Sequence, residues 1–313
     1  MSVYNTPDDW LCQSIQSVLD QSYSEFEFLI VDDRTSQSNK DILKFYREKD
    51  SRIHILKNEH NEGLTKSLNK ALAAAKGDFI ARLDSDDIAL PQRFEKQLEQ
   101  FMANEKLVLC GTWATTINGE KKGSCKTLVG TSDYLKINLL FGNIFVHSSV
   151  MIRSSILKKN NLMYDENFKA AQDFELWSRL AQYGDIKNID EIHCVYRIHE
   201  KQISTKQIDL QNSYRDEIIQ KNLAKIGLII SKQNISRYIN VIHAKGEKEK
   251  VWWIFVHSFK IMIMLFMHYG IKAVQINKYI LWNSALMIKK QIYFFLKPIM
   301  QQHSYANHNH RCK

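Results

Sequence analysis

The first 200 residues alternate between short apolar runs and longer amphipathic segments. Short apolar runs that end at polar residues predict buried strands, and apolar residues at every third or fourth position predict helices. After a strand stub at residues 1–5, the pattern predicts strands at residues 26–31, 53–56, 79–83, 108–116, 146–152 and 192–198. It predicts helices at residues 8–21, 39–50, 65–76, 91–104, 133–140 and 170–180. Strands and helices that alternate at short spacing indicate a parallel sheet with helices on both faces.

Acidic residues follow two of the expected strands. Asp33 comes after the second strand, and Asp84, Asp86 and Asp87 come directly after the fourth. In parallel α/β sheets, ligands bind beyond the carboxyl ends of the strands. Carboxylates this close repel one another unless a cation neutralises them, and oxygen ligands of this kind suit Mg²⁺ or Mn²⁺. A solvated acidic turn that caps the next helix is the alternative, because an Asp-x-Asp motif alone is a weak signal.

The composition is that of a folded globular protein with an uneven distribution of charge. The chain has 313 residues, 44% of them hydrophobic, and a net charge of +9. Residues 201–313 hold 18 Lys and Arg against 5 Asp and Glu, whereas the first 200 residues hold 25 against 29. Such a basic region is typical of contact with an anionic surface, and we favour a membrane over nucleic acid because no nucleic-acid-binding module is recognisable. Five scattered cysteines and the absence of a signal peptide indicate a reducing, cytoplasmic location.

A change of character near residue 205 predicts two regions, residues 1–205 and residues 206–313. In the second region two stretches are almost wholly apolar, residues 251–269 and 279–300, and the first has about the length of a membrane span. A lysine inside the first stretch argues against a span, because it is costly at the centre of a bilayer. The following residues recur there at helical spacing: His257, Lys260, Met264, His268 and Lys272. We therefore expect an interfacial helix on the cytoplasmic face of the inner membrane, with a soluble helical subdomain as the alternative.

Seven short motifs of this chain resemble those of the family 2 glycosyltransferases, which have the GT-A fold. They are MSVYN (residues 1–5), IVDD (30–33), NEGLTKSLN (61–69), LDSDD (83–87), HSSVM (147–151), QDFELW (172–177) and YRIH (196–199). Each motif is weak alone, but their order and spacing over residues 1–205 are specific. The resemblance implies a Rossmann-like mixed α/β sheet with helices on both faces, followed by a helical C-terminal region. It also implies transfer of a sugar from a nucleotide diphosphate donor with inversion at the anomeric carbon.

The resemblance assigns a role to several residues on the donor side. Tyr4 would stack on the nucleobase, Asp33 would accept a hydrogen bond from the uracil N–H, and Lys66 would meet the diphosphate. Asp84 would lie on the ribose side of the nucleotide. Outside the family context these residues have ordinary explanations, namely a strand-end aromatic, a helix cap and a solvated lysine.

The resemblance also assigns a metal site and an acceptor side. Asp86 would bind the divalent cation together with His199, and Arg197 would neutralise phosphate. Asp173 would be the general base that takes the proton of the attacking hydroxyl, and His147 would lie near the acceptor. The ordinary explanations are a helix-capping residue for Asp173 and a hydrogen-bonded core histidine for His147.

The chain departs from the family pattern at two places. Relatives begin with several apolar residues before the SVYN motif, and this chain has almost none, so we expect a truncated first strand or a misassigned start codon. Gln172 stands where many relatives carry Glu before the catalytic Asp. Trp177 follows one turn later and is expected in the core rather than as a platform for the sugar.

The sequence therefore predicts an inverting, metal-dependent glycosyltransferase of cell-surface polysaccharide assembly, such as lipopolysaccharide or capsule. A UDP-sugar is the expected donor, and a glycan or lipid-linked glycan is the expected acceptor. A nucleotidyltransferase on a similar sheet is one alternative, although it would normally carry a glycine-rich loop that residues 4–7 lack. An inactive membrane-associated binding protein is the other alternative, because a shortened first strand would weaken the sheet beside the nucleotide.

Overall fold

The computed structural model describes residues 1–200, 202, 207–231, 234–235 and 251–270. The chain divides into two compact units, Met1–Ile218 and Ile219–Lys313. The C-terminal part contains helix α9 (Ile208–Lys225) and helix α11 (Val251–Tyr269). The second apolar stretch expected from the sequence, residues 279–300, lies outside the described residues. The region boundary expected near residue 205 stays a prediction.

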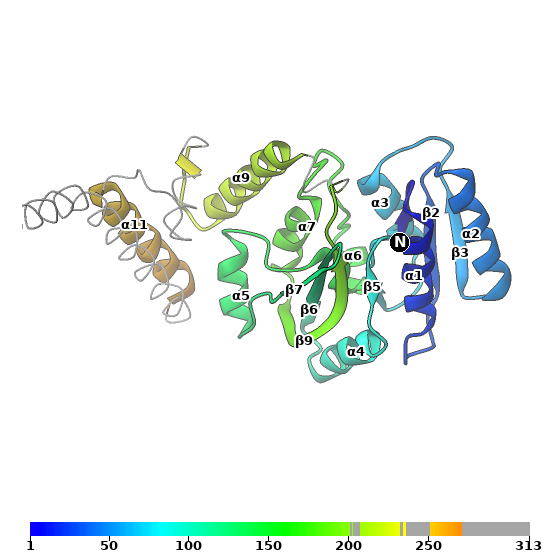
Figure 1. The fold of residues 1–313 in the computed structure, drawn as a ribbon. Helices are drawn as coiled ribbons and strands as arrows, with labels where there is room; N and C mark the ends of the chain where they lie inside the picture. The colour runs from blue at the N-terminus through cyan, green and yellow to red at the C-terminus, as the bar shows by residue number, and fades with distance from the viewer. Residues whose placement is uncertain (201, 203–206, 232–233, 236–250, 271–313) are drawn as a thin grey trace, which may run out of the picture. The chain divides into compact units, whose positions relative to one another are not determined.

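The first part of the chain forms a three-stranded parallel sheet (Figure 1). Its strands stand in the order β1 (Ser2–Val3), β2 (Phe28–Asp32) and β3 (Ile53–Lys57). The helices of this part are α1 (Asp8–Leu19), α2 (Gln37–Lys49) and α3 (Leu64–Ala74). The carboxyl ends of the three strands therefore share one edge, as the sequence predicted for this part of the chain.

A second, mixed sheet follows, with the strand order β4-β8-β6-β9-β5. Its strands are β4 (Phe79–Ala81), β5 (Ile88–Ala89), β6 (Leu107–Asn118), β8 (Met151–Arg153) and β9 (Asp185–Arg197), with β7 (Lys121–Cys125) paired to β6. Only β6 and β9 run parallel, and the other pairs of this sheet are antiparallel. Its helices are α4 (Arg93–Ala103), α5 (Ser132–Leu139), α6 (Ser154–Lys159) and α7 (Gln172–Leu180).

The mixed sheet corrects the prediction of one parallel sheet that the alternation of elements alone suggested, and it agrees with the mixed α/β sheet that the family resemblance implied. The strand expected at residues 146–152 is also wrong over most of its length. Residues His147–Ser149 form a 3₁₀ turn, and only the short β8 follows. The Ser149 hydroxyl donates to the Val146 carbonyl (2.9 Å), and such side-chain bonds to nearby backbone compete with strand pairing.

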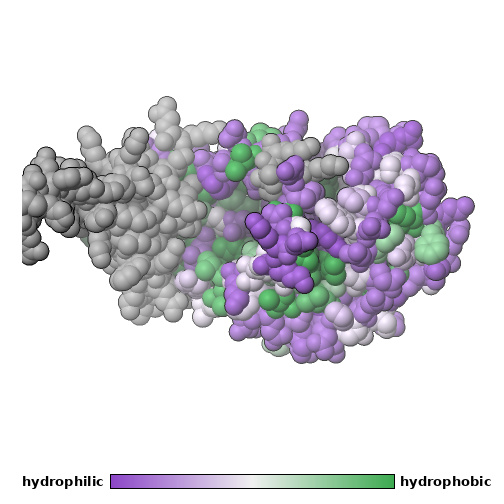
Figure 2. Space-filling view, in the orientation of Figure 1, coloured by the Kyte–Doolittle hydropathy of each residue, from purple (hydrophilic) through white to green (hydrophobic). Residues whose placement is uncertain are grey.

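The core of residues 1–218 lies between the helices and the sheets. Buried side chains such as Ile15, Ile30, Leu109 and Trp177 have almost no exposed surface, so the expectation of a core role for Trp177 is confirmed. The face seen in Figure 2 is mostly hydrophilic over the first part of the chain, with hydrophobic side chains in small patches. A mostly polar surface with small apolar patches is typical of a folded globular domain.

Candidate active site

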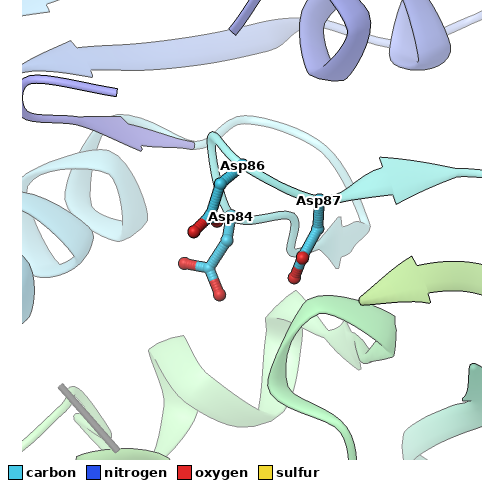
Figure 3. A group of neighbouring side chains, drawn as sticks. All are labelled: Asp84, Asp86 and Asp87. Atoms are coloured by element: carbon cyan, nitrogen blue, oxygen red, sulfur yellow. The ribbon is translucent and has the colours of Figure 1, made fainter. Parts of the chain in front are cut away.

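An acidic loop, residues 84–87, leaves β4 and leads into β5. The carboxylates of Asp84 and Asp86 lie next to one another and Asp87 lies beside them (Figure 3). One oxygen of each lies within 4.8 Å of the oxygens of the other two. A set of carboxylate oxygens at this spacing fits a hard divalent cation such as Mg²⁺ or Mn²⁺.

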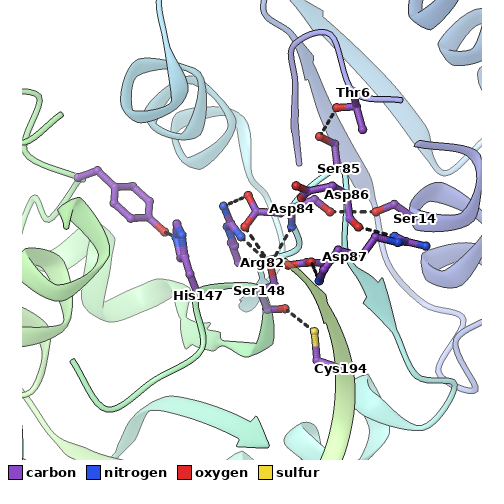
Figure 4. A network of polar contacts seen from close by, with 12 residues as sticks. Thr6, Ser14, Arg82, Asp84, Ser85, Asp86, Asp87, His147, Ser148 and Cys194 are labelled. Carbon is purple, nitrogen blue, oxygen red and sulfur yellow. Dashed lines mark hydrogen bonds and ion pairs between the residues drawn. The ribbon is translucent and has the colours of Figure 1, made fainter. Parts of the chain in front are cut away.

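The backbone of this loop is held by side chains from the first part of the chain (Figure 4). The Ser14 hydroxyl on α1 donates to the Asp84 carbonyl oxygen (2.9 Å). The hydroxyls of Thr6 and Ser85 share a hydrogen bond of 2.7 Å. The two sheets thus meet at this loop, and its geometry is set before any ligand arrives.

Arg82 and Ser148 organise the carboxylates from the other side. The Arg82 guanidinium is 5% exposed, forms an ion pair with Asp84 and donates to the Ser148 hydroxyl oxygen (2.9 Å). The Ser148 hydroxyl lies between the carboxylates of Asp84 (2.9 Å) and Asp87, and its single hydrogen serves one of them at a time. A buried cation and one hydroxyl therefore fix two of the three acids.

The three carboxyl groups differ in their pKa values. Burial alone would raise the pKa of Asp84, but the charge and hydrogen bond of Arg82 outweigh it and lower the value to about 2. Burial raises the pKa of Asp86, as does the charge of Asp84, against a lowering by His199. Burial, followed by the charges of Asp84 and Asp86, raises the pKa of Asp87 well above its usual value. One arginine thus neutralises one acid, and the remaining repulsion favours the binding of a cation.

The side chains of Asp86 and His199 lie together in the structure, whereas their predicted role as metal ligands stays a prediction. Nε2 of His199 lies 2.8 Å from Oδ2 of Asp86, and the imidazole packs against the Trp10 ring with centroids 5.1 Å apart. A carboxylate and an imidazole at this distance are suitable ligands for one divalent ion. Asp87 is less available, because its carboxylate accepts from the Arg197 backbone N–H (2.8 Å) and from Ser148.

Arg197 supports the acidic loop from β9. Its guanidinium donates to the Asp86 carbonyl oxygen and to the Gln13 side chain, and it lies 5.5 Å above the Trp10 ring. The residue is only 6% exposed. The predicted contact of Arg197 with phosphate stays a prediction, whereas its bonds to the loop are part of the fold.

Asp33 follows β2 and is 1% exposed. Its Oδ1 accepts from the Asn58 amide (2.7 Å) and from the Glu62 N–H (2.8 Å), and its Oδ2 accepts from the Gly63 N–H (2.9 Å). Gly63 has a φ of +85° and precedes helix α3, so the carboxylate fixes the turn into that helix. One acceptor position of the carboxylate is left for a base N–H.

Two more residues were expected to bind the nucleotide-sugar donor. Lys66 lies near this turn, and Tyr4 lies near the end of β1. Lys66 stands exposed in the first turn of α3, where a phosphate would meet both the helix N-terminus and the ammonium group. Tyr4 follows β1 and is 51% exposed. Its ring is therefore accessible to a nucleobase.

Asp173 lies in the first turn of α7, after Ala171 with a φ of +56°. Its Oδ2 accepts from the Asn143 amide (2.7 Å). Burial raises the pKa of Asp173, against lowering by the Phe174 N–H, the charge of Arg82 and Asn143. The charge of Arg82 thus contributes to lowering the pKa of both Asp173 and Asp84.

His147 is held in an aromatic cluster behind Arg82. Its Nε2 lies 3.0 Å from the Tyr164 hydroxyl, and its ring meets the Trp177 ring edge-on at 6.0 Å. Burial and the charge of Arg82 lower the pKa of His147 well below its usual value, so the ring is neutral at pH 7. A neutral imidazole can accept or donate one hydrogen bond, but it carries no charge for an acceptor.

Four residues of the site were not singled out from the sequence: Arg82, Ser148, Asn143 and Asn58. Arg82 lies inside an expected buried strand. Because a buried arginine needs an acidic partner, the acids directly after this strand could have indicated its role in the site. Ser148 belonged to a recognised motif, but its partners come from residues more than 60 positions away. Asn58 and Asn143 carried no local signal.

The two sheets with an acidic loop at their junction form a fold known from glycosyltransferases. Residues of this chain superpose on the crystal structure of Staphylococcus aureus TarS 1–349 in complex with UDP, with a TM-score of 0.58 over 93% of this chain and 87% of that one. At 17% identity this likeness shows the fold alone.

Sequence comparison defines the family. The model of glycosyl transferase family 2 matches residues 1–159, and the chain belongs to that family and is a glycosyltransferase. It is 37% identical over 218 residues to the uncharacterized glycosyltransferase MJ1057 of Methanocaldococcus jannaschii, covering 68% of this chain and 74% of that protein. It is 35% identical over 201 residues to the O-antigen biosynthesis glycosyltransferase WbnJ of Escherichia coli, covering 62% and 76%.

Proposed function

We propose that this enzyme transfers a sugar, with inversion, from a UDP-sugar to a hydroxyl of a glycan or lipid-linked glycan in cell-surface polysaccharide assembly. The observation that carries the proposal is the acidic loop where the two sheets meet, at which the carboxylates of Asp84, Asp86 and Asp87 gather beside His199, with a further carboxylate, Asp173, in the first turn of α7. Two carboxylate groups with separate tasks are what the reaction needs, one beside the leaving diphosphate and one beside the attacking hydroxyl. The name of WbnJ supports the polysaccharide context, and the TarS complex supports UDP as the nucleotide.

The proposed donor site runs along the carboxyl ends of β1, β2 and β4. The exposed Tyr4 ring stacks on the base, the remaining acceptor position of Asp33 reads the base N–H, and Lys66 meets the diphosphate from the start of α3. Asp84, already paired with Arg82, faces the ribose. Family membership and the absence of a glycine-rich loop at residues 4–7 do not favour a nucleotidyltransferase.

Asp86 and His199 are the proposed ligands of a divalent cation, Mg²⁺ or Mn²⁺. Their side-chain atoms are 2.8 Å apart and belong to groups that such ions accept, and burial, followed by the charge of Asp84, raises the pKa of Asp86. When bound, the ion offsets the negative charge that develops on the departing nucleoside diphosphate. Arg197 keeps the loop in place through the Asp86 carbonyl oxygen.

Asp173 is the proposed general base. The acceptor oxygen forms a bond to the anomeric carbon, its proton passes to Asp173, and the bond from the anomeric carbon to the diphosphate oxygen breaks. The raised pKa of Asp173 suits this task, because a base with a pKa closer to neutral holds the proton better. Asn143 orients the carboxylate, and the neutral His147 lies on the acceptor side.

A peripheral membrane contact of α11, on the cytoplasmic face, completes the proposal. Four apolar side chains of α11 are exposed at helical spacing, Phe259 (54%), Ile263 (42%), Phe266 (57%) and Met267 (74%), so they share one face. Lys260 is exposed beside them, as an interfacial helix requires. Among the described residues, no helix is both long and apolar enough to cross a bilayer.

Asp173→Asn tests the base. The substitution keeps the shape of the side chain but removes its ability to take a proton, so turnover should fall by about 10²–10⁴-fold with donor binding unchanged. UDP release from a panel of UDP-sugars with Mg²⁺ or Mn²⁺ measures turnover, and calorimetry measures donor binding. Asp41→Asn, an exposed carboxylate on α2, is the matched control. Full turnover in Asp173→Asn would refute the assignment, and pyrophosphate release instead of UDP would refute the reaction.

A further inference from the structure

Trp10 lies on helix α1 and is only partly buried, whereas the buried face of that helix is formed by other residues, among them Leu11 and Ile15. The indole contacts two polar side chains from the end of β9 and the turn that follows it. The His199 ring centroid lies 5.1 Å from that of Trp10, with the ring planes at 55°. Cζ of the Arg197 guanidinium lies 5.5 Å from the centroid of the same ring. This tryptophan therefore packs on polar groups of the candidate site in addition to supporting the fold.

Both partners of the indole also contact Asp86, at different atoms. Nε2 of His199 lies 2.8 Å from the carboxylate oxygen Oδ2, and the Arg197 guanidinium donates to the backbone carbonyl oxygen of Asp86. A displaced indole would therefore affect both the side chain and the backbone of this acid. Trp10 and Asp86 are the two groups that the imidazole and the guanidinium have in common.

The hydrogen bonds of the turn after β9 fix the backbone of His199 rather than its ring. The Gln202 side chain accepts from the His199 N–H (3.3 Å) and donates to the Arg197 carbonyl oxygen. Among the residues that the structure describes, the imidazole forms its one hydrogen bond with Asp86 and its one aromatic contact with Trp10. The His199 side chain is 21% exposed, so the indole restricts a ring that solvent would leave free to turn.

Helix α1 supports the acidic loop at two places. Gln13 lies three positions after Trp10 and therefore on the same side of the helix, and its Oε1 accepts from the Arg197 guanidinium. The Ser14 hydroxyl donates to the Asp84 carbonyl oxygen (2.9 Å). The helix thus fixes the backbone of the loop through Ser14, and through Trp10 and Gln13 it holds the side chains that meet Asp86.

We infer that Trp10 is a positioning residue of the cation site, whose indole holds the His199 imidazole at the distance from Asp86 at which both can bind one divalent ion. The inference rests on the proposed function, because it takes Asp86 and His199 as the ligands. Removing a group that orients a metal ligand typically costs about 10–100-fold in metal affinity. An alkyl side chain fills part of the volume of the indole but offers no flat face to the imidazole, so it does not keep this orientation.

The test is the affinity of the full chain for Mn²⁺ in the presence of UDP, measured from the EPR signal of free Mn²⁺. We expect the dissociation constant to rise about 10–100-fold in Trp10→Leu and by a smaller factor in Trp10→Phe, which keeps part of the ring contact. Phe45→Leu is the matched control, because Phe45 is a half-exposed aromatic residue on α2 whose ring also contacts a cation, Lys49 (4.0 Å). Its Mn²⁺ affinity should equal that of the unsubstituted chain.

His199→Ala supplies a second measurement, because it removes the ring that Trp10 orients. In the His199→Ala background, Trp10→Leu should cost little further Mn²⁺ affinity, since both substitutions remove the same interaction. A general weakening of the fold would instead lower the affinity in both backgrounds. Thermal unfolding shows which variants are folded, and Trp10→Phe carries the same comparison if Trp10→Leu does not fold.

Two results would overturn the inference and leave the proposed function standing. One is an unchanged Mn²⁺ affinity in Trp10→Leu when Asp86→Asn loses affinity. The other is a pair of losses that add in the double variant of Trp10 and His199. Unchanged affinity in both Asp86→Asn and His199→Ala would overturn the inference together with the proposed cation site.

Discussion

The carboxylates at the ends of the two sheets are stabilised in opposite ways. Asp33, after β2, accepts hydrogen bonds from three neutral donors of its own neighbourhood. Asp84, Asp86 and Asp87, after β4, lie against one another, and the buried cation Arg82 pairs with Asp84 alone. Both oxygens of the first carboxylate accept hydrogen bonds from the fold, whereas the second group carries charge that the fold leaves unbalanced. The role of an acidic residue that follows a strand therefore depends on the groups that donate hydrogen bonds to it. Its position at the end of a strand does not by itself decide that role.

Asp86→Asn should have the largest effect on activity. The substitution removes a charged ligand but also relieves repulsion, so we expect turnover at a fixed Mn²⁺ concentration to fall about a hundredfold or more, with stability unchanged or raised. A metal titration of UDP release, together with thermal unfolding, measures both quantities. An unchanged metal titration would remove Asp86 from the proposed site.

Asp33→Asn, unlike Asp86→Asn, should lower the stability of the fold. The amide loses charge-assisted bonds from Asn58, Glu62 and Gly63, and its NH₂ group meets donors, so the free energy of unfolding should fall by about 2–4 kcal/mol. Urea unfolding at neutral pH measures this loss. A variant of unchanged stability would break the contrast between the two sheets.

Asn143→Ala should have the smallest effect, a several-fold loss of activity at acidic pH. Its hydrogen bond lowers the pKa of Asp173, so removing it should raise that pKa further. The base must be deprotonated, and the acid limb of the kcat/KM profile should therefore move to higher pH with the alkaline side unchanged. An acid limb at the same pH would separate Asn143 from the general base.

Local sequence patterns determined the succession of helices and strands, the acidic turn after residues 79–83 and, through seven motifs, the family. These features depend on residues close together in the chain, whose periodicity and turn chemistry are read directly. The same patterns predicted one parallel sheet, because alternation of elements does not fix strand direction. They also predicted a strand at residues 146–152, where serine side chains form a 3₁₀ turn instead.

Only the tertiary structure decided which acids are neutralised and by what. Arg82 and Ser148 reach the Asp84 carboxylate from segments more than 60 residues apart, and the three donors to Asp33 come from the segment between β3 and α3. Burial and opposing charge depend on distances between segments that are remote in the sequence, and a local sequence pattern does not determine those distances.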